Sequence, residues 1–311
     1  MYKLTTLFGL LLLPLTFKSV FCFPFPSWEE YLERFPHIEI HSKSRGYFLE
    51  NIKFIIEHNA MGHSYKLGVT PFLHLSEAEW KGRFYNITPD YTSSEVYTSP
   101  YLRSFPSSWS WVDQGVTTPV KDQLNCGSCW AFSTTESIET TWAIKTGELK
   151  VLSPQQLVDC SKFNQGCNGG LQSRAYKYLE GTGQCLEEDY PYTAKDGSCH
   201  SCSESVGKVT SYVTVKNEKD METAILVTSL AVAIQADQRE FQMYTSGVLD
   251  FKCGTNLNHA VNVEGYGTED GKDYWLVRNS WSSDWGNKGY IKMARGKDLC
   301  GISQSVVYPK M

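Results

Sequence analysis

One cysteine and one histidine have the surroundings that nucleophilic catalysis requires. Cys129 follows the stretch QLNCGS at 123–128, where we expect a helix to begin near Ser128. The N–H groups and the dipole at the start of a helix stabilise a thiolate, which is the form of cysteine that attacks carbonyl carbons. A thiolate also needs a base within reach, usually a histidine. His259 opens an alternating apolar segment and so has a rigid mounting, whereas His200 lies in a cysteine-dense loop.

Two side-chain amides and a tryptophan can complete this pair. Asn279 lies in another predicted strand and would orient the imidazole of His259, while Trp281 would shield that hydrogen bond from water. The amide of Gln123 could join the backbone N–H of Cys129 in an oxyanion hole. Cys129 would then form an acyl-enzyme, and His259 would hold the proton and deliver it to the leaving amine.

The segments around these residues predict an α+β fold. Residues 27–85 are helical in pattern, and residues 86–104 are typical of an extended linker. A helix is expected from Ser128 through Thr141, with Gly147 as its natural stop. The second half of the chain contains short apolar segments bounded by glycines, which we expect to be strands: 231–234, 260–263, 274–277 and 290–293. A helix-rich half followed by a β-rich half is typical of the α+β class.

The first residues have the pattern of a secretory signal peptide. Lys3 precedes an apolar run of nine residues, 7–15, which is shorter than the roughly 20 residues that a membrane-spanning helix needs. We expect cleavage after Cys22, with Ser19 as the alternative; a hydrophobic core helix is the weaker interpretation. The protein is therefore expected in the secretory pathway, with a lysosome, an endosomal vacuole or the extracellular space as its destination. Asn86 begins an Asn-Ile-Thr sequon and is a glycosylation acceptor.

The net charge limits which binding partners are expected, and the cysteine content bears on whether a metal site is expected. A formal net charge of −5 over 311 residues gives no reason to expect nucleic acid or a membrane as a partner. In an oxidising compartment the ten cysteines are expected to form disulfides before they bind metal. The Cys-x-x-Cys pairs ending at Cys129 and starting at Cys199 are 70 residues apart, much further than the about 15–20 residues of a zinc ribbon. We expect no metal and no cofactor.

The chain resembles a preproenzyme of the papain family, of the cathepsin L-like kind, over essentially its whole length. The most specific feature is Cys-Gly-Ser-Cys-Trp at 126–130, with His259 and Asn279 placed 130 and 150 residues after Cys129. Other segments resemble family landmarks in the family's order: PVKDQ at 119–123, GCNGG at 166–170, YPY at 190–192 and NSW at 279–281. The resemblance implies a papain-like fold, in which a helical left subdomain and a β-barrel-like right subdomain have the active site between them.

The same resemblance implies how the chain is organised and what it acts on. A signal peptide at 1–22 would be followed by a helical inhibitory propeptide at 23–104 and a peptidase domain at 105–311. No insertion like the occluding loop of cathepsin B follows Gly170, so the implied activity is that of a cysteine endopeptidase made as a zymogen. Its partners would be protein and peptide substrates, its own propeptide as an intramolecular inhibitor, and cystatin-like inhibitors. The enzyme would act as a monomer.

The family's disulfide pattern carries over as an expectation. It implies the bridges Cys126–Cys167, Cys160–Cys199 and Cys253–Cys300. Cys185 and Cys202 remain for a fourth bridge, and Cys199 and Cys202 could exchange roles because sequence does not fix connectivity.

The resemblance also assigns the pocket for the second residue before the cut, called P2. The residues expected in this pocket and along the cleft are Leu171, Ala233, Leu257 and Ser305, with Gly169, Gly170 and Trp281. No acidic residue stands at the base of the pocket, so an apolar P2 side chain is favoured over arginine.

The expected propeptide keeps part of the family's helix signature. Four residues follow its F-x2-N-x3-I-x3-N portion: Phe48, Asn51, Ile55 and Asn59. The glutamate and arginine expected upstream are out of register. His74 stands where the family usually has an acid. We hypothesise that protonation of His74 below about pH 6.5 loosens the propeptide.

Other interpretations remain open from the sequence. A redox protein would use Cys126 and Cys129 as a disulfide pair. A catalytically dead homologue that serves as a binding protein would have no need to keep the nucleophile, the base and both amides together. A thiol-dependent transpeptidase would use the same acyl-enzyme with an amine in place of water. Leu124, where relatives often have glycine, and Ser110, where many have an acid, depart from the family pattern near the cleft.

Overall fold

The computed structural model describes residues 25–90, 95–100 and 105–311. The expected signal peptide at 1–22, with Cys22, lies outside the described residues. The described residues divide into two compact units, residues 25–36 and 37–311. In the first unit α1 (Trp28–Arg34) begins with a capping box, in which the Ser27 side chain accepts from the N–H of Glu30 and the Glu30 carboxylate accepts from the N–H of Ser27.

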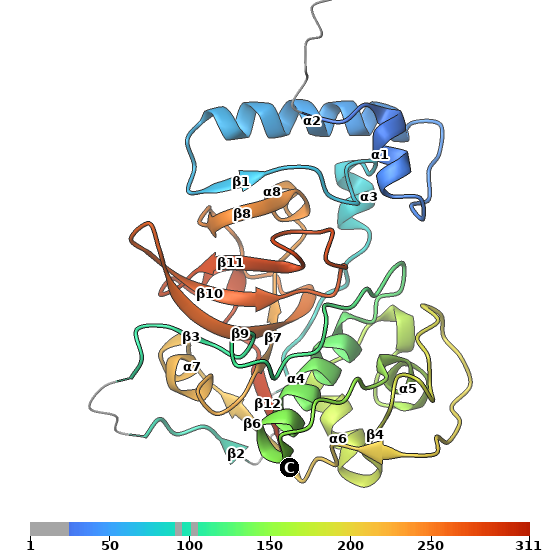
Figure 1. Ribbon diagram of the computed structural model, residues 1–311, viewed down its shortest axis with the longest axis vertical. Coiled ribbons are helices and arrows are strands. Elements are labelled where there is room, and N and C mark those ends of the chain that lie inside the picture. Colours follow the sequence, from blue (N-terminus) through green and yellow to red (C-terminus); the bar gives the residue numbers. More distant parts are fainter. Residues whose placement is uncertain (1–24, 91–94, 101–104) are drawn as a thin grey trace, which may run out of the picture. The chain divides into compact units, whose positions relative to one another are not determined.

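The second unit opens with elements that precede residue 90. α2 (Ser44–Ala60) carries Phe48, Asn51 and Ile55 at spacings of three and four residues, so these side chains share one buried face. β1 (Tyr65–Leu67) and α3 (Glu77–Lys81) follow. β1 pairs antiparallel with β8 (Tyr244–Leu249), and Figure 1 shows these two strands side by side beneath α2.

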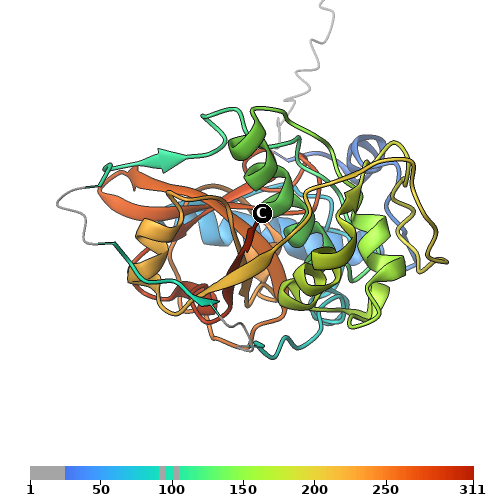
Figure 2. The same ribbon diagram turned by 90° about the horizontal axis from the view of Figure 1, so that it is seen from below.

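A group of helices forms one half of the second unit: α4 (Cys129–Thr146), α5 (Pro154–Cys160), η1 (Gly166–Asn168) and α6 (Gln172–Thr182). α4 runs past its predicted end to the predicted stop, Gly147, which adopts a left-handed φ of 78°. Trp130 and Ile138 of α4 share a core with Leu157 and Leu179. In Figure 2 the green helix α4 lies between the strands and the other helices. None of the described helices is both long and apolar enough to cross a membrane.

The other half is built on a sheet. Its further strands are β2 (Glu95–Val96), β3 (Trp109–Ser110), β6 (Ser211–Val215), β7 (Leu230–Ile234), β9 (His259–Glu269), β10 (Lys272–Arg278), β11 (Tyr290–Ala294) and β12 (Val306–Lys310). The order is β1-β8-β11-β10-β9-β7-β12-β6-β2, with β3 on β9. β4 (Gln184–Cys185) and β5 (Ser205–Val206) form a separate pair. Three short helices connect strands: α7 (Glu218–Ala224), α8 (Arg239–Gln242) and η2 (Leu299–Gly301). The four predicted strands are confirmed within β7, β9, β10 and β11.

Four disulfides join eight of the nine cysteines of the described residues: Cys126–Cys167, Cys160–Cys199, Cys185–Cys202 and Cys253–Cys300. Cys199 and Cys202 therefore do not exchange partners, and the two remaining cysteines do form a fourth bridge. Cys126 pairs with Cys167 rather than with Cys129, which leaves Cys129 as a free, buried thiol. The redox interpretation required a Cys126–Cys129 pair, and the structure contradicts it.

Candidate active site

Cys129 is the first residue of α4, and its sulfur lies among several hydrogen-bonding groups. The backbone N–H of Ala260 donates to Sγ at 3.4 Å, and the hydroxyl of Tyr85 lies 3.2 Å from Sγ. The chain enters the helix through Gly127, where an added Cβ would lie 2.4 Å from the carbonyl oxygen of Cys167. A residue without a side chain is needed at this position because the backbone of the 166–170 segment passes so close.

His259 and Asn279 come together because they stand at neighbouring strand ends. His259 is the first residue of β9, and Asn279 directly follows β10, which pairs with β9. Nε2 of His259 lies 2.8 Å from Oδ1 of Asn279, and both residues are buried. The ring of Trp281 stacks on the imidazole, with 4.6 Å between ring centroids and 21° between planes. Since Ala260 bonds to Sγ, the start of β9 also lies against the cysteine.

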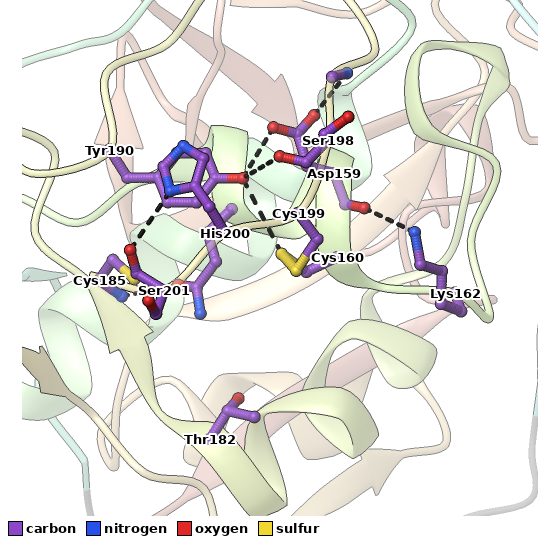
Figure 3. Close-up of a disulfide and its surroundings, with 12 residues drawn as sticks. Asp159, Cys160, Lys162, Thr182, Cys185, Tyr190, Ser198, Cys199, His200 and Ser201 are labelled. Carbon is purple, nitrogen blue, oxygen red and sulfur yellow. Dashed lines mark hydrogen bonds between the residues drawn. A yellow bond between two sulfur atoms is a disulfide. The ribbon is translucent and has the colours of Figure 1, made fainter.

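The second histidine candidate, His200, lies in a different environment. Its ring stacks on Tyr190 at 3.7 Å, beside the disulfide between Cys160 and Cys199 (Figure 3). The Tyr190 hydroxyl donates to Asp159 at 2.8 Å. His200 therefore packs against the helical half, and the structure brings His259, not His200, to Cys129.

Burial sets the charge of the cysteine–histidine pair in this structure. Burial raises the pKa of the Cys129 thiol, and hydrogen bonds from Tyr85, Ala260 and the first N–H groups of α4 only partly oppose this. Burial also lowers the pKa of His259 to about 4; the hydrogen bond to Asn279 opposes this shift, and the positive charge of Arg83 adds to it. The pair is thus a neutral thiol and a neutral imidazole. The thiolate expected at the helix start does not form here, because desolvation outweighs the helix terminus.

Gln123, the predicted second donor of an oxyanion hole, is held close to the start of α4 by two hydrogen bonds. Its Nε2 donates to the carbonyl of Cys126 at 3.0 Å, and its Oε1 accepts from the hydroxyl of Ser280 at 2.8 Å. These bonds fix the amide plane and involve one of the two N–H groups of the amide. The other N–H has no hydrogen-bond partner among the described residues.

The predicted P2 residues meet around a side chain that sequence reasoning missed. Ile87 is buried in a cluster with Leu171, Ala233 and Leu257, and its N–H donates to the carbonyl of Leu257 at 2.8 Å. Ser305 borders the cluster, because its carbonyl accepts from the N–H of Ala233 at 3.0 Å. The predicted pocket is therefore apolar and filled by residue 87 of the same chain.

Tyr85 lies against the two glycines predicted along the cleft. Its hydroxyl is 3.5 Å from the carbonyl oxygen of Gly170, and a Cβ on Gly169 would lie 2.7 Å from its ring. Phe84 lies edge-on to His259 and Trp281, at centroid distances of 5.9 and 6.2 Å. The sequence contained one signal for this arrangement: an aromatic pair, Phe84 and Tyr85, ends the segment expected to be helical, and Ile87 follows at the start of the expected linker.

The segment before Tyr85 is fixed to the sheet half by further contacts. Arg239 donates to the Asn51 side chain at 2.6 Å and lies over the ring of Phe54, and the Thr70 hydroxyl donates to the carbonyl of Gln242 at 3.0 Å. Together with the pairing of β1 and β8, these contacts hold the segment from Asn51 to Thr70 against the sheet half.

Comparison with known proteins identifies a family. The model described as "Papain family cysteine protease" matches residues 105–310. The chain is 44% identical over 275 residues to "Probable cysteine protease RD21B" of Arabidopsis thaliana, which covers 84% of this chain and 59% of the relative. It is 39% identical over 276 residues to chymopapain of Carica papaya, covering 84% of this chain and 78% of the relative. The chain spans about three fifths of the length of the first relatives it matches.

Solved structures resemble the chain as well. A crystal structure of the ragweed pollen allergen Amb a 11 cysteine protease in its proform has a TM-score of 0.82 and 31% identity, covering 91% of this chain and 93% of that one. Digestive procathepsin L 3 of Tenebrio molitor has a TM-score of 0.84 and 32% identity, covering 91% and 98%. The predicted α+β, papain-like fold is confirmed. The chain belongs to the papain family of cysteine proteases.

Proposed function

We propose that this chain is a cysteine endopeptidase made as an inactive zymogen, with Cys129 as nucleophile and His259 as its base. The observation that carries the proposal is the free thiol at the start of α4, placed against the start of β9, where His259 is oriented by Asn279. The same thiol is covered by Tyr85 of the chain's own N-terminal segment.

The reaction uses groups whose positions are already fixed. Because Nε2 of His259 is bonded to Asn279, Nδ1 takes the thiol proton while Sγ of Cys129 attacks the substrate carbonyl. The C–N bond breaks, the proton passes from His259 to the leaving amine, and a thioester remains on Cys129. Water then gives a proton to His259 and attacks the thioester, which releases the acid and restores the thiol. The N–H of Cys129 and the second N–H of Gln123 stabilise the oxyanion.

The direction of the covering segment supports its role as an inhibitor rather than a substrate. In a substrate, the P2 residue comes before the carbonyl that the thiol attacks. In this chain Ile87 fills the predicted P2 pocket and comes after Tyr85, which lies on Sγ. The segment thus runs opposite to a substrate. It also holds Cys129 and His259 neutral by burial, so removal of the segment is what activates the pair.

The filled pocket supports an apolar P2 preference. Ile87 lies among Leu171, Ala233 and Leu257, and an isoleucine or leucine of a substrate would recover the same apolar contacts. An arginine would have no acidic partner among these residues.

The proposal includes a secretory route. Four disulfides suit an oxidising compartment, and the side chain of Asn86 is exposed, so a glycan can be accommodated there. We place a signal peptide at 1–22, an inhibitory propeptide at 23–104 and the peptidase at 105–311, with a lysosome, a vacuole or the extracellular space as destination. Two similar solved structures are proforms. Protein substrates and cystatin-like inhibitors are the proposed partners of the processed enzyme.

The test is hydrolysis of fluorogenic dipeptide substrates after incubation of the proenzyme near pH 5. Wild type should cleave substrates with Phe or Leu at P2 faster than one with Arg, and Cys129→Ala should cleave none. Hydrolysis by Cys129→Ala at the wild-type rate would show that Cys129 is not the nucleophile. Silence in wild type after loss of the segment before residue 105 would favour a binding protein. Transfer of the acyl group to an added amine, without hydrolysis, would favour a transpeptidase.

A further inference from the structure

We propose that the loop at 122–125 is a subsite for a guanidinium group on the leaving-group side of the cut, so that the processed enzyme favours substrates with arginine there. This inference rests on the proposed function and adds a substrate feature to it. The loop precedes the nucleophile helix and contains Leu124, whose departure from the family's usual glycine had no explanation in the sequence.

A guanidinium already occupies this loop in the structure. Nη1 of Arg83 donates to Oδ1 of Asn125 at 2.9 Å, and Nη2 donates to the carbonyl oxygen of Leu124 at 3.1 Å. Two different nitrogens of one planar group thus reach two acceptors on neighbouring residues. Arginine makes such forked contacts, and lysine has no equivalent planar fork.

The loop is held in a shape that presents its oxygens. Leu124 has a φ of 51°, a left-handed conformation that is uncommon for a residue other than glycine. Its N–H donates to Oδ1 of Asp122 at 2.9 Å, which ties the turn closed. Its side chain is half exposed, so packing does not explain the conformation. The flanking backbone is fixed by bonds from Gln123 to Ser280 and from Ser282 to Lys121.

Charge at the loop also favours a cation. Burial lowers the pKa of Arg83 and the carboxylate of Asp122 opposes this shift, while the negative charge of Asp284 acts on Asp122 in turn. Lys121, the residue before the loop, forms a salt bridge with the buried carboxylate of Glu139, with 2.6 Å between Nζ and Oε1. Phe72 lies under the guanidinium, 5.2 Å from its carbon, but Phe72 belongs to the covering segment and leaves with it. The acceptors and the acidic groups stay on the processed enzyme.

The position of the loop relative to the thiol defines the subsite. Tyr85 lies on Sγ, and Ile87, two residues after it, marks the P2 side of the cleft. Arg83 comes two residues before Tyr85 and lies on the other side. Two residues span at most about 7 Å, so the loop is within reach of the first or second residue after the scissile bond, called P1′ and P2′.

The test uses internally quenched peptides with leucine at P2 and the processed, full-length peptidase. Arginine is placed at P1′ or P2′ and compared with citrulline, which has the same shape and no charge. Hydrogen bonds to a charged group are strong enough to give a preference of about tenfold in kcat/KM at one of the two positions. Asn125→Ala should reduce the ratio of arginine to citrulline severalfold. Gln114→Ala, an exposed amide beside a groove over β9 to β11, should leave it unchanged.

Equal kcat/KM for arginine and citrulline at both positions would overturn the inference and would mean that the loop serves only the zymogen. A ratio that survives Asn125→Ala intact would overturn the assignment to this loop. Cleavage of none of the peptides would instead contradict the proposed function, and this inference with it. The two failures are therefore distinguishable from one set of peptides.

Discussion

At the scale of single residues, the sulfur of Cys129 is covered by the side chain of Tyr85. The hydroxyl of Tyr85 lies 3.2 Å from Sγ. Burial raises the pKa of the thiol, although the hydrogen bond from Tyr85 opposes this shift, and burial lowers the pKa of His259 to about 4. A neutral thiol is a poor nucleophile. The inhibited state is thus maintained electrostatically as well as by occupation of the cleft.

Replacement of Tyr85 by alanine should expose the thiol while the rest of the segment stays bound. We expect the Tyr85→Ala zymogen to be alkylated at Cys129 by iodoacetamide at least about tenfold faster than wild type, since large aromatic contacts at such sites are typically worth this much or more. Peptide mass spectrometry at pH 8, over times too short for processing, gives the rate. Tyr85→Phe is the matched control and should change the rate less. An unchanged rate in Tyr85→Ala would show that the ring does not protect the sulfur.

We expect His74 to make the binding of the segment depend on pH. Burial lowers the pKa of His74 to about 4 in the bound state, Arg83 adds to this shift, and the Pro71 backbone and Glu79 oppose it. In the bound segment His74 therefore gains its proton near pH 4 rather than near the expected pH 6.5. Because the released histidine has the ordinary pKa, the contribution of His74 to binding is present above about pH 6.5. It is lost progressively as the pH falls toward about 4.

We therefore expect wild type to process faster than His74→Gln at pH 5, by a factor on the order of ten, and at a similar rate at pH 7. Gel densitometry of the proenzyme against time measures both rates. If the processing rates of the two proteins depend on pH in the same way, His74 has no role in activation.

At the scale of secondary-structure elements, the sequence predicted those helices and strands whose formation depends on residues close together in the chain. The helix that begins at Cys129 follows from the apolar spacing of its sequence, and its stop at Gly147 follows from the preference of a left-handed C-cap for glycine. The strands that carry His259 and precede Asn279 follow from alternation and flanking glycines, although Asn279 itself lies just beyond the strand in which it was predicted. The pairing of β1 with β8 did not follow, because register between segments about 180 residues apart leaves no local pattern. The placement of Tyr85 and Ile87 was missed for the same reason.

The β1–β8 pair makes a prediction about latency. Gly247 has a φ of 78°, and a Cβ there would lie 2.3 Å from the carbonyl oxygen of Ser64 and 2.8 Å from Cα of Tyr65. Gly247→Ala should therefore separate β1 from β8 and accelerate processing at pH 5 by about tenfold, the effect of a loss of about 1.4 kcal/mol. Gly271→Ala is the control, because Gly271 has a φ of 74° and open space around it. Equal processing rates in the two variants would argue against a role of this strand pair.

At the scale of the whole second unit, a buried charge cluster joins the helical half to the sheet. Glu136 and Glu139 come from α4, Glu264 from β9 and Arg278 from β10. Arg278 Nε lies 3.3 Å from the Glu136 carboxylate. Burial raises the pKa of Glu136 to about 7 and that of Glu264 to about 8, although Arg278 opposes both shifts. These carboxyl groups are therefore largely protonated at acidic pH.

This cluster predicts a fold that is more stable in acid. The pKa of Glu264 is higher in the folded chain than its ordinary value of 4.5, so its contribution to stability is fully present below about pH 4.5 and is lost as the pH rises toward 8. Glu264→Gln should raise the melting temperature at pH 8 by about 2–4 °C and change it little at pH 5. Differential scanning fluorimetry is sufficient, with the exposed Glu148→Gln as control. A larger rise in melting temperature at pH 5 than at pH 8 would contradict the predicted loss of this contribution with rising pH.

The most direct test of the account is site-specific labelling before and after processing. A peptidyl vinyl sulfone with leucine at P2 reacts with an activated thiol that has a leucine-accepting pocket beside it, so a single adduct reports the nucleophile, the pocket and the covering segment together. We predict one adduct per chain, located on Cys129 by peptide mass spectrometry, formed rapidly after removal of the segment before residue 105 and barely before it. Labelling on another residue, or at the same rate in both forms, would contradict the account.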